Sequence, residues 1–209
     1  MIEVLPSIKT SPDSGGHGIA SAAARMESRR AAFIAVLPAD LLAREDALPT
    51  RARSDNASPQ SKLGRIYALV DEFSAHRAPF VACKTGCASC CKMNVQISNL
   101  EAARITAATG HRARAVARTV LHADTEFAGQ PCPFLQNDAC SIYDHRPFVC
   151  RHHASFDVDD HWCDPVRMQT ETVPLLELTG ALQAVGEVLR QTRQPVLADI
   201  RDFFGKGAA

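Results

Sequence analysis

Eight cysteines are the residues whose type and spacing most clearly indicate chemistry in this chain of 209 residues. Cysteine thiolates are soft donors that suit zinc and iron–sulfur clusters, and a four-coordinate site takes four of them. Eight thiols are therefore enough for two complete sites, or for one site with four thiols left over. The candidate metal ligands are Cys83, Cys87, Cys90, Cys91, Cys132, Cys140, Cys150 and Cys163.

The four cysteines nearest the N-terminus are crowded together in the order C-x3-C-x2-C-C. Cys87 and Cys90 have the spacing at which a tight turn aims two thiolates at one metal, and Cys83 lies one helical turn ahead of Cys87. Side chains of adjacent residues diverge in both extended and helical backbone. Cys90 and Cys91 are therefore expected to serve two different sites, or one binds metal while the other packs or hydrogen-bonds nearby.

The other four cysteines lie in residues 130–164, a segment with three prolines and no sustained hydrophobic period. Irregular segments of this length are uncommon inside a compact domain unless something other than backbone pattern holds them, and metal ligation can do so. Pro147 is expected to start a helical turn that contains Cys150. A thiolate at Cys150 would then be stabilised by the helix N-terminus.

Histidines in the same segment are alternative ligands, because imidazole can replace a thiolate at a zinc site. His152 or His153 is the main candidate, and His145 and His161 share the segment. Basic residues near the cysteines can offset the negative charge of bound thiolates, which is about −2 for four thiolates on one zinc ion. These basic residues are Lys84, Lys92, Arg146 and Arg151.

The composition excludes several classes of function. Hydrophobic residues make up 46% and charged residues 22% of the chain, which rules out wholesale disorder. The 23 basic and 23 acidic residues balance, so there is no overall electrostatic case for binding nucleic acid or an anionic membrane. No apolar run approaches the roughly 20 residues that a membrane span needs.

The expected location is the cytoplasm. Residues Ser28-Arg29-Arg30 resemble a twin-arginine export signal, but the apolar run after them ends at Leu37, before Pro38, and an amphipathic helix explains the stretch better. In a reducing compartment, eight cysteines favour metal or redox chemistry over disulfides.

The apolar periodicity predicts a mainly α fold: a helical domain with irregular cysteine loops stapled by metal and at most a minimal β pair. A capping box of Ser98 and Glu101 is expected to start a helix that Gly110 ends. Other helices are expected over residues 19–44, divided by Pro38 into a long and a short helix, and over residues 61–76, 111–127 and 175–189, with a short one after Pro195. Residues 95–97 are read as one strand, and residues 49–61 as an exposed connector.

The expected domain organisation follows from these elements. Residues 1–18 are predicted to be a flexible leader, residues 19–60 a helical N-terminal extension and linker, residues 61–204 the cysteine-cluster domain with its C-terminal helices, and residues 205–209 a frayed tail. Arg112, Arg114 and Arg118 would lie largely on one helix face. Such a row is typical of a solvated face, and it can also bind an acidic protein partner.

The order of the cysteines and their neighbours resembles the YkgJ-like cysteine-cluster family. The resemblance covers about residues 80–152 and rests on Cys83, Cys87, Cys90, Cys91, Cys132, Pro133, Cys140, Ile142, Tyr143, Arg146, Pro147, Cys150 and Arg151. It implies zinc or iron chelation, and Cys163 lies outside the matching part. A similar domain occurs in flagellin lysine methylases with an iron–sulfur cluster, but this chain is far shorter and has no glycine-rich S-adenosylmethionine loop, so that activity is not carried over.

Three hypotheses for function follow. The first is a metal-binding protein that chelates zinc or an iron–sulfur cluster through its cysteines. The second is an iron–sulfur enzyme or electron-transfer protein, although the spacing C-x3-C-x2-C of radical S-adenosylmethionine enzymes here lacks their series of parallel strands. The third is an interaction module in which zinc is structural. The expected partner is thus a metal ion or cluster, with a protein partner possible.

Overall fold

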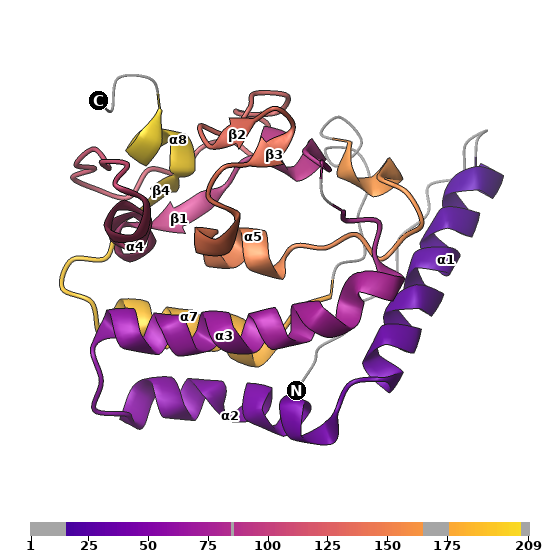
Figure 1. Cartoon of the computed structure of the whole chain (residues 1–209), viewed down its shortest axis with the longest axis horizontal. Coiled ribbons are helices and arrows are strands. Elements are labelled where there is room, and N and C mark those ends of the chain that lie inside the picture. Colours follow the sequence, from indigo (N-terminus) through magenta and orange to yellow (C-terminus); the bar gives the residue numbers. More distant parts are fainter. Residues whose placement is uncertain (1–15, 85, 165–175, 206–209) are drawn as a thin grey trace.

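The computed structural model describes residues 16–84, 86–164 and 176–205. Within them the fold is mainly α, as predicted (Figure 1). The helices are α1 Gly16–Ala35, α2 Ala39–Ser54, α3 Pro59–Arg77, α4 Asn99–Thr109, α5 Phe148–His152, α7 Thr179–Arg190 and α8 Ile200–Phe204. Short 3-10 turns include η1 Ala78–Phe80, η2 Ser89–Lys92, η3 Tyr143–His145 and η4 His161–Cys163. Residues 1–15 of the predicted leader and residues 206–209 of the predicted tail lie outside the described residues.

Two small antiparallel sheets accompany the helices, where at most one β pair was expected. Strand β1 Gln96–Ser98 pairs with β4 Leu197–Asp199 in the register Ile97 to Ala198. Strands β2 Leu135–Gln136 and β3 Ala139–Cys140 form a hairpin. The turn of the hairpin is Asn137-Asp138, whose φ angles are 49° and 56°, the left-handed backbone that two-residue hairpin turns require.

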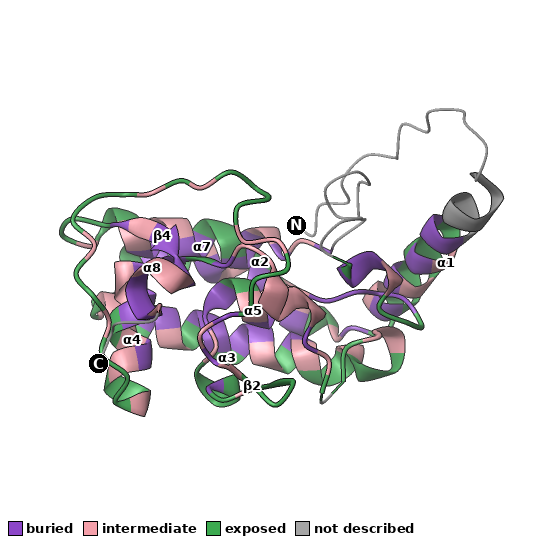
Figure 2. Cartoon of the chain, turned by 90° about the horizontal axis from the view of Figure 1, so that it is seen from above, coloured by how far each residue is buried: buried purple, intermediate pink, exposed green. Residues whose placement is uncertain are grey.

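The larger hydrophobic core lies between α1, α2, α3 and α7. Figure 2 shows the buried positions of α2, α3 and α7 facing the interior of the molecule, with exposed positions on their outer faces. Fully buried members from these helices and from the cysteine segment include Phe33, Leu41, Leu63, Ile66, Ala181, Val188, Phe156 and Trp162. The helical layer is therefore packed directly against residues of the cysteine-bearing segment.

A second, smaller core lies around the β1–β4 pair. Its buried members include Val95, Ile97, Ile105, Phe134, Ile142, Ala198, Ile200 and Phe203. The carboxylate of Asp199 accepts a hydrogen bond from the backbone N–H of Val95 at 2.6 Å, and Ile200 donates its N–H to the carbonyl of Val95 at 2.8 Å. The C-terminal elements are thus joined to the chain that leads out of the first cysteine cluster.

The predicted capping box is confirmed, and its glutamate has a wider role. Ser98 and Glu101 cap α4 reciprocally, and Gly110 ends the helix with a φ of 76°. Glu101 also accepts hydrogen bonds from the Tyr67 hydroxyl at 2.8 Å and from the Phe148 backbone N–H at 2.9 Å. This carboxylate therefore connects α3, α4 and the start of α5.

The helix predicted over residues 111–127 is absent, and this prediction was wrong. The segment is irregular because its backbone bonds to the C-terminal elements instead of to itself. Arg114 donates its N–H to the carbonyl of Phe203 at 2.8 Å, and Val120 donates to that of Leu197 at 2.9 Å. Val116 and Val120 pack against the second core, so the apolar period reflects tertiary contacts.

The boundaries near residues 49–61 were also misread. The helix after Pro38 is not short, because α2 continues through Pro49 to Ser54, and most of the expected connector is helical. Helix α3 starts at Pro59, a favourable first position because proline has no N–H to leave unbonded. Its cap is Ser58, which accepts from the N–H of Ser61, so Ser61 is not the cap. None of the described helices combines the length and apolar character that a membrane span needs.

Candidate metal centre

The structure describes all eight cysteines, and each is a free thiol. The elements α5, β2 and β3, which lie among the cysteine-bearing segments, are on the side of α3 opposite α2 (Figure 1). Cys83 is exposed, Cys132 and Cys163 are buried, and the remaining five are partly buried. Side chains from residues 83–91 thus meet side chains from residues 132–163, and the relation between individual thiols decides what they can bind.

Four of the thiols pack against the second core, and we call them the Cys91 group: Cys91, Cys132, Cys140 and Cys150. The backbone N–H of Cys132 donates to the carbonyl of Cys91 at 2.7 Å. The hairpin then brings Cys140 opposite Leu135. Every pair of these four thiols lies close enough for the charge of one to raise the pKa of another, in addition to the effect of burial.

The environment of Cys150 differs from the one expected. Pro147 does precede α5, so Cys150 lies in the first turn of a helix. Burial nevertheless raises the pKa of the Cys150 thiol, and the charges of the other thiols of the Cys91 group act in the same direction. A helix of five residues does not compensate for this loss of solvent. A bound cation would be needed to hold Cys150 as a thiolate.

Three further thiols form the Cys83 group: Cys83, Cys87 and Cys163. Burial and the charges of Cys83 and Cys87 raise the pKa of Cys163 to about 12. Backbone contacts bring the segments together, because Ala82 donates its N–H to the carbonyl of Ser155 at 2.9 Å. The side chain of Ser155 in turn faces the Cys163 sulfur. Cys163 therefore belongs with the first two cysteines of the motif.

Cys90 lies between the two groups. It hydrogen-bonds to Cys91 within the 3-10 turn η2, and this bond, with burial, raises the pKa of Cys90. The same bond lowers the pKa of Cys91 to about 7. The charges of Cys83 and Cys150 also act on Cys90. The side chains of Cys90 and Cys91 thus lie side by side, although adjacent side chains were expected to diverge, and Cys90 borders both groups.

Positive charges accompany both groups, but they are only partly the ones predicted. Arg201, Arg146 and Lys92 all act to lower the pKa of Cys91. Burial lowers the pKa of Arg77, while the neighbouring Cys83 acts against this shift.

Two of the basic residues named from the sequence, Arg151 and Lys84, have surroundings other than those expected. Arg151 is bound by the carboxylate of Asp71, with its Nη1 atom 2.6 Å from Oδ2, and it stacks over the ring of Tyr67 at 4.7 Å. It therefore holds α5 against α3 instead of serving the thiols. Lys84 is exposed.

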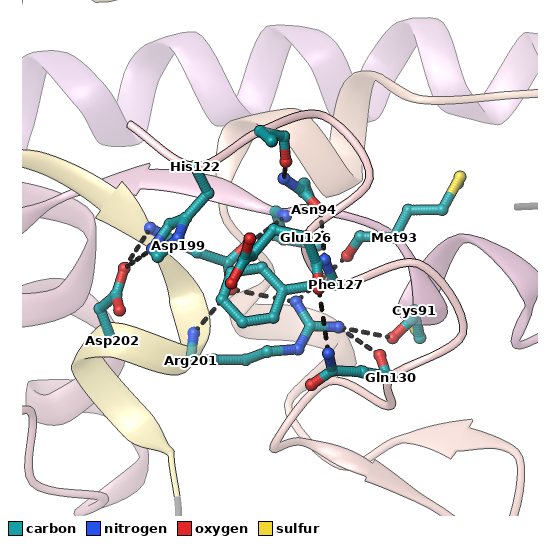
Figure 3. Close-up of polar contacts among 12 residues, drawn as sticks. Cys91, Met93, Asn94, His122, Glu126, Phe127, Gln130, Asp199, Arg201 and Asp202 are labelled. Atoms are coloured by element: carbon teal, nitrogen blue, oxygen red, sulfur yellow. Dashed lines mark hydrogen bonds and ion pairs between the residues drawn. The ribbon is translucent and has the colours of Figure 1, made fainter. Parts of the chain in front are cut away.

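Arg201 is the cation most deeply built into the site (Figure 3). Its side chain is only 9% exposed and pairs with Asp199 at 3.0 Å. Its Nη1 atom donates to the Met93 carbonyl at 3.1 Å, and its Nη2 atom donates to the carbonyls of Gln130 at 2.5 Å and Cys91 at 3.4 Å. The guanidinium also lies 4.8 Å from the ring centroid of Phe127. Arg201 thus joins the first cysteine segment to the chain just ahead of Cys132.

The two histidines proposed as ligands have different environments. The Nε2 atom of His152 accepts a hydrogen bond from the Leu178 backbone N–H at 3.0 Å, so that nitrogen already has a partner. Burial lowers the pKa of His152 to about 4, with further contributions from His153 and Arg77. The Nε2 atom of His153 is buried with no hydrogen-bond partner among the described residues. His153 is therefore the histidine that keeps a nitrogen available.

A buried carboxylate supports the Cys83 group. The side chain of Asp157 is fully buried and accepts hydrogen bonds from Arg25 in α1 at 2.6 and 2.9 Å and from the Trp162 indole at 2.9 Å. Burial acts to raise the pKa of Asp157, but the hydrogen bonds outweigh it and leave this pKa below its ordinary value. Asp157 thereby fixes Trp162, the neighbour of Cys163.

The possible metal donors are free thiols with cations beside them, and this chemistry suits zinc or iron. In the described chain, however, no three or more His, Cys, Asp or Glu side chains converge closely enough to hold an ion as they stand. Enclosing an ion would therefore require the sulfur atoms to move toward one another. Such movement is compatible with the irregular segments that carry the cysteines, since metal binding and local folding are coupled in sites of this kind.

The residues that could not be identified from the sequence are those whose contacts join positions far apart along the chain. Arg201 and Asp199 fall within the short helix expected after Pro195, and Asp157 falls within the irregular segment of residues 130–164. One signal was available for Asp199: with Asp202 it forms a capping box on α8, which places a carboxylate at a helix start. Nothing local could indicate that Arg201 reaches Cys91, which is 110 positions away in the sequence.

The comparisons with known proteins agree with this chemistry. Residues 82–165 match the family model CxxCxxCC, described as a "putative zinc- or iron-chelating domain". The match spans less than half of the chain but includes all eight cysteines, Cys163 among them. No curated protein and no solved structure matches the chain. Residues 82–165 are therefore similar to the cysteine-cluster family of zinc- or iron-chelating domains.

Proposed function

We propose that this protein binds zinc or an iron–sulfur cluster through its eight cysteines. The observation that carries the proposal is that free thiols from residues 83–91 and from residues 132–163 lie close enough for their charges to act on one another, in segments with little regular structure. Thiols that remain unpaired while lying near one another are available to metal. The proposal implies a reducing compartment such as the cytoplasm, because oxidised thiols would not bind.

Metal analysis on protein purified without oxygen tests the proposal directly. Zinc, iron and acid-labile sulfide are measured per chain together with the visible absorption spectrum. We expect either a colourless protein with zinc or a brown protein with iron and sulfide in equal amounts. A chain free of all three, purified from cells supplied with both metals, would contradict the proposal.

Metal removal provides a second test. Because metal binding contributes to the free energy of folding, a chelator is expected to open residues 83–92 and 130–164 to hydrogen exchange. Helices α2, α3 and α7 contact one another through buried apolar residues and are expected to retain their protection. Equal protection of the cysteine segments with and without metal would show that metal does not hold them.

An iron–sulfur enzyme or electron-transfer protein is the second candidate function. The exposure of Cys83 favours it, because a partner or substrate could reach that edge of the thiol set. An interaction module with structural zinc has less support. The helix face of Arg112, Arg114 and Arg118 on which it depended is not formed, and Arg114 donates to the carbonyl of Arg201 at 2.8 Å. A reversible one-electron reduction of the purified protein would select the second candidate.

A further inference from the structure

We infer that the cleft between α2 and α3 binds a small amphipathic anion, a molecule with an apolar body and one carboxylate or phosphate group. The cleft has a volume of about 380 Å³, which lies within the range of small-molecule sites. No cysteine lines it, and α5, β2 and β3 lie on the side of α3 opposite α2 (Figure 1). Binding in the cleft is therefore separate from metal binding by the thiols.

The packing of α2 explains why there is space beside α3. Helix α2 contacts α7 more extensively than it contacts α3. At Gly180 the backbone of α7 comes so close to α2 that a Cβ atom on this residue would lie 2.2 Å from the Glu45 carbonyl oxygen. Toward α3, by contrast, the small side chains of Ala52 and Ala68 line the cleft. Helix α2 thus packs on α7 and leaves a groove beside α3.

The floor of the cleft is apolar. Leu48 and Ala52 of α2 and Ile66 and Leu69 of α3 line it, and all four are buried members of the larger hydrophobic core. Ala68 is exposed and also lines the cleft. Ligand sites are mostly apolar with a small number of polar groups that fix orientation, so this floor suits a hydrocarbon chain or ring.

The polar lining has an excess of positive charge. Four basic and two acidic side chains line the cleft: Arg44, Arg51, Lys62, Arg65, Asp55 and Glu72. Glu72 binds Arg44, and Asp55 binds Arg65 with its Oδ2 atom 2.7 Å from Nη1. Among the described residues, neither Arg51 nor Lys62 forms an ion pair with a carboxylate. These two cations are the groups that an anionic ligand can neutralise.

Lys62 is the cation built into the floor. Its side chain is buried, and its Nζ atom donates to the Ala52 carbonyl at 2.8 Å and to the Gln191 Oε1 atom at 2.6 Å. Both acceptors are neutral, and an ammonium group has a third N–H to donate. Because a buried charge is costly unless it is paired, an anion beside Lys62 is favoured.

Arg51 complements Lys62 from the rim. It is exposed and precedes Ala52, whose carbonyl holds Lys62. A guanidinium presents a planar set of donors that matches carboxylate and phosphate oxygens. The head group of the ligand is therefore expected beside Arg51, with its apolar body on the floor.

The ends of the cleft favour a small molecule over a peptide helix. The pair of Arg44 and Glu72 joins α2 to α3 at one end. At the other end Arg65 of α3 binds Asp55, the residue that follows α2. A helix lying along the groove would have to displace both ion pairs, whereas a compact molecule fits between them.

Calorimetric titration of the full chain with octanoate, and with octanol as its uncharged counterpart, tests the chemistry. We expect one octanoate to bind per chain and octanol to bind about tenfold more weakly. Arg51→Gln should weaken octanoate binding by about the same factor and leave octanol binding unchanged. Arg53→Gln is the matched control: Arg53 is on α2 but outside the lining, and pairs with Glu187 at 2.7 Å. It should leave both affinities unchanged.

Ala68→Phe tests the location without changing any charge. Because Ala68 is exposed, the phenyl ring can be accommodated while it occupies the groove, and octanoate binding should be lost. Ala43→Phe is the control, since Ala43 is an exposed position of α2 that does not line the cleft. Far-ultraviolet circular dichroism and urea denaturation show whether each variant keeps its fold.

Several outcomes would overturn the inference. They are octanoate binding weaker than about 1 mM, equal affinities for octanoate and octanol, an unchanged affinity in Arg51→Gln, or binding that persists in a folded Ala68→Phe variant. A dimer in sedimentation experiments that Ala68→Phe dissociates would also overturn it, because a second copy of the chain would then occupy the cleft. Metal content is measured in the same variants and should equal that of the unsubstituted chain, so failure of ligand binding and failure of metal binding are seen separately.

Discussion

The Nη2 atom of Arg201 lies 3.4 Å from the backbone carbonyl oxygen of Cys91, across 110 positions of sequence. This contact joins α8 to the cysteine motif, and it is one of several that the same guanidinium makes with backbone carbonyls. Arg201 lies beyond residues 82–165, the part that matches the family model. The C-terminal elements of this chain are therefore structural support for the thiols.

Substituting Arg201 by lysine is expected to loosen this support. Lysine keeps the charge but cannot reproduce the planar fork that contacts several carbonyls at once. We expect a loss of about 2–4 kcal/mol in the free energy of unfolding, since buried charged hydrogen bonds are lost. The metal that we propose the chain binds should also be released faster to a chelator.

Arg190→Lys is the matched control for Arg201→Lys. Arg190 is exposed on α7 and pairs with Glu187 at 2.7 Å, and an exposed pair contributes about 0–1 kcal/mol. Its substitution should leave metal release unchanged. Equal behaviour of the two variants in urea denaturation and in chelator competition would argue against a supporting role for Arg201.

Local signals in the sequence predicted the parts of the fold that depend on local physics. The capping box of Ser98 and Glu101 was visible because its partners are three residues apart, and Gly110 because a left-handed residue ends many helices. The helix expected over residues 175–189 is present as α7, but its buried face consists of Gly180, Ala181, Ala184, Val185 and Val188, and Leu182 is exposed. In each case the residues that make the contact are neighbours along the chain.

The errors fall where distant residues decide the structure. The apolar spacing around Val116 and Val120 fits a helix, yet these side chains meet the second core from an irregular backbone that bonds to β4 and α8. The thiol motif indicated metal chemistry, but the spacing could not show that Cys163 joins Cys83 and Cys87. That relation depends on Asp157, Trp162 and the packing of α1, none of which has a local signature.

Gly180→Ala is expected to destabilise the helical layer without affecting the metal site directly. Pro49 has no N–H to donate to the carbonyl of Glu45, and α7 approaches this carbonyl closely. A Cβ atom on residue 180 would lie 2.2 Å from that oxygen. We expect a loss of at least about 2 kcal/mol from this overpacking, measured by urea denaturation.

Gly186→Ala in the same helix should have the opposite effect. The nearest atom to its added Cβ is the flexible end of Arg190, at 3.7 Å. Alanine is favoured over glycine in a helix by about 1 kcal/mol, so this variant should be unchanged or more stable. Similar losses of stability in both variants would mean that the contact with the Glu45 carbonyl is not the reason why alanine at position 180 is destabilising.

Glu45 should make part of the stability depend on pH. Its carboxylate is buried and accepts from the Ala181 N–H at 2.9 Å. Burial raises the pKa of Glu45 above its ordinary value, and the backbone hydrogen bonds only partly oppose this shift. The folded chain therefore holds this proton more tightly than the unfolded chain. The resulting stability is present below the ordinary pKa and is lost as pH rises through the raised one.

Glu45→Gln tests this dependence, because glutamine keeps an oxygen acceptor but does not ionise. The free energy of unfolding of this variant, relative to the unsubstituted chain, should increase between pH 4 and pH 7. Taking the difference between two chains at each pH cancels the pH dependence of metal binding, which they share. A difference that stays constant, or that decreases with pH, would show that Glu45 is not protonated more easily in the folded chain.

Asp157→Asn is expected to damage the Cys83 group through Trp162. The asparagine amide can accept at one oxygen only, so Arg25 or Trp162 loses its partner in a buried place. Breaking a buried ion pair from one side costs about 3–5 kcal/mol. Because the Arg25 side chain is 39% exposed, the expected loss lies near the lower end. The Cys163 thiol, buried in the native chain, should react faster with a maleimide once its neighbour is released.

Asp159→Asn separates this effect from the general charge of the loop. Asp159 is exposed and accepts one hydrogen bond, from the His161 N–H at 3.1 Å, so its substitution should cost less than about 1 kcal/mol. Thiol labelling followed by mass spectrometry measures the exposure of Cys163 in both variants. If Asp157→Asn lowered stability but left Cys163 as slow to react as in Asp159→Asn, the carboxylate would support the α1 contact alone. Faster labelling of Cys163 only in Asp157→Asn would show that the ion pair with α1 holds this thiol in place.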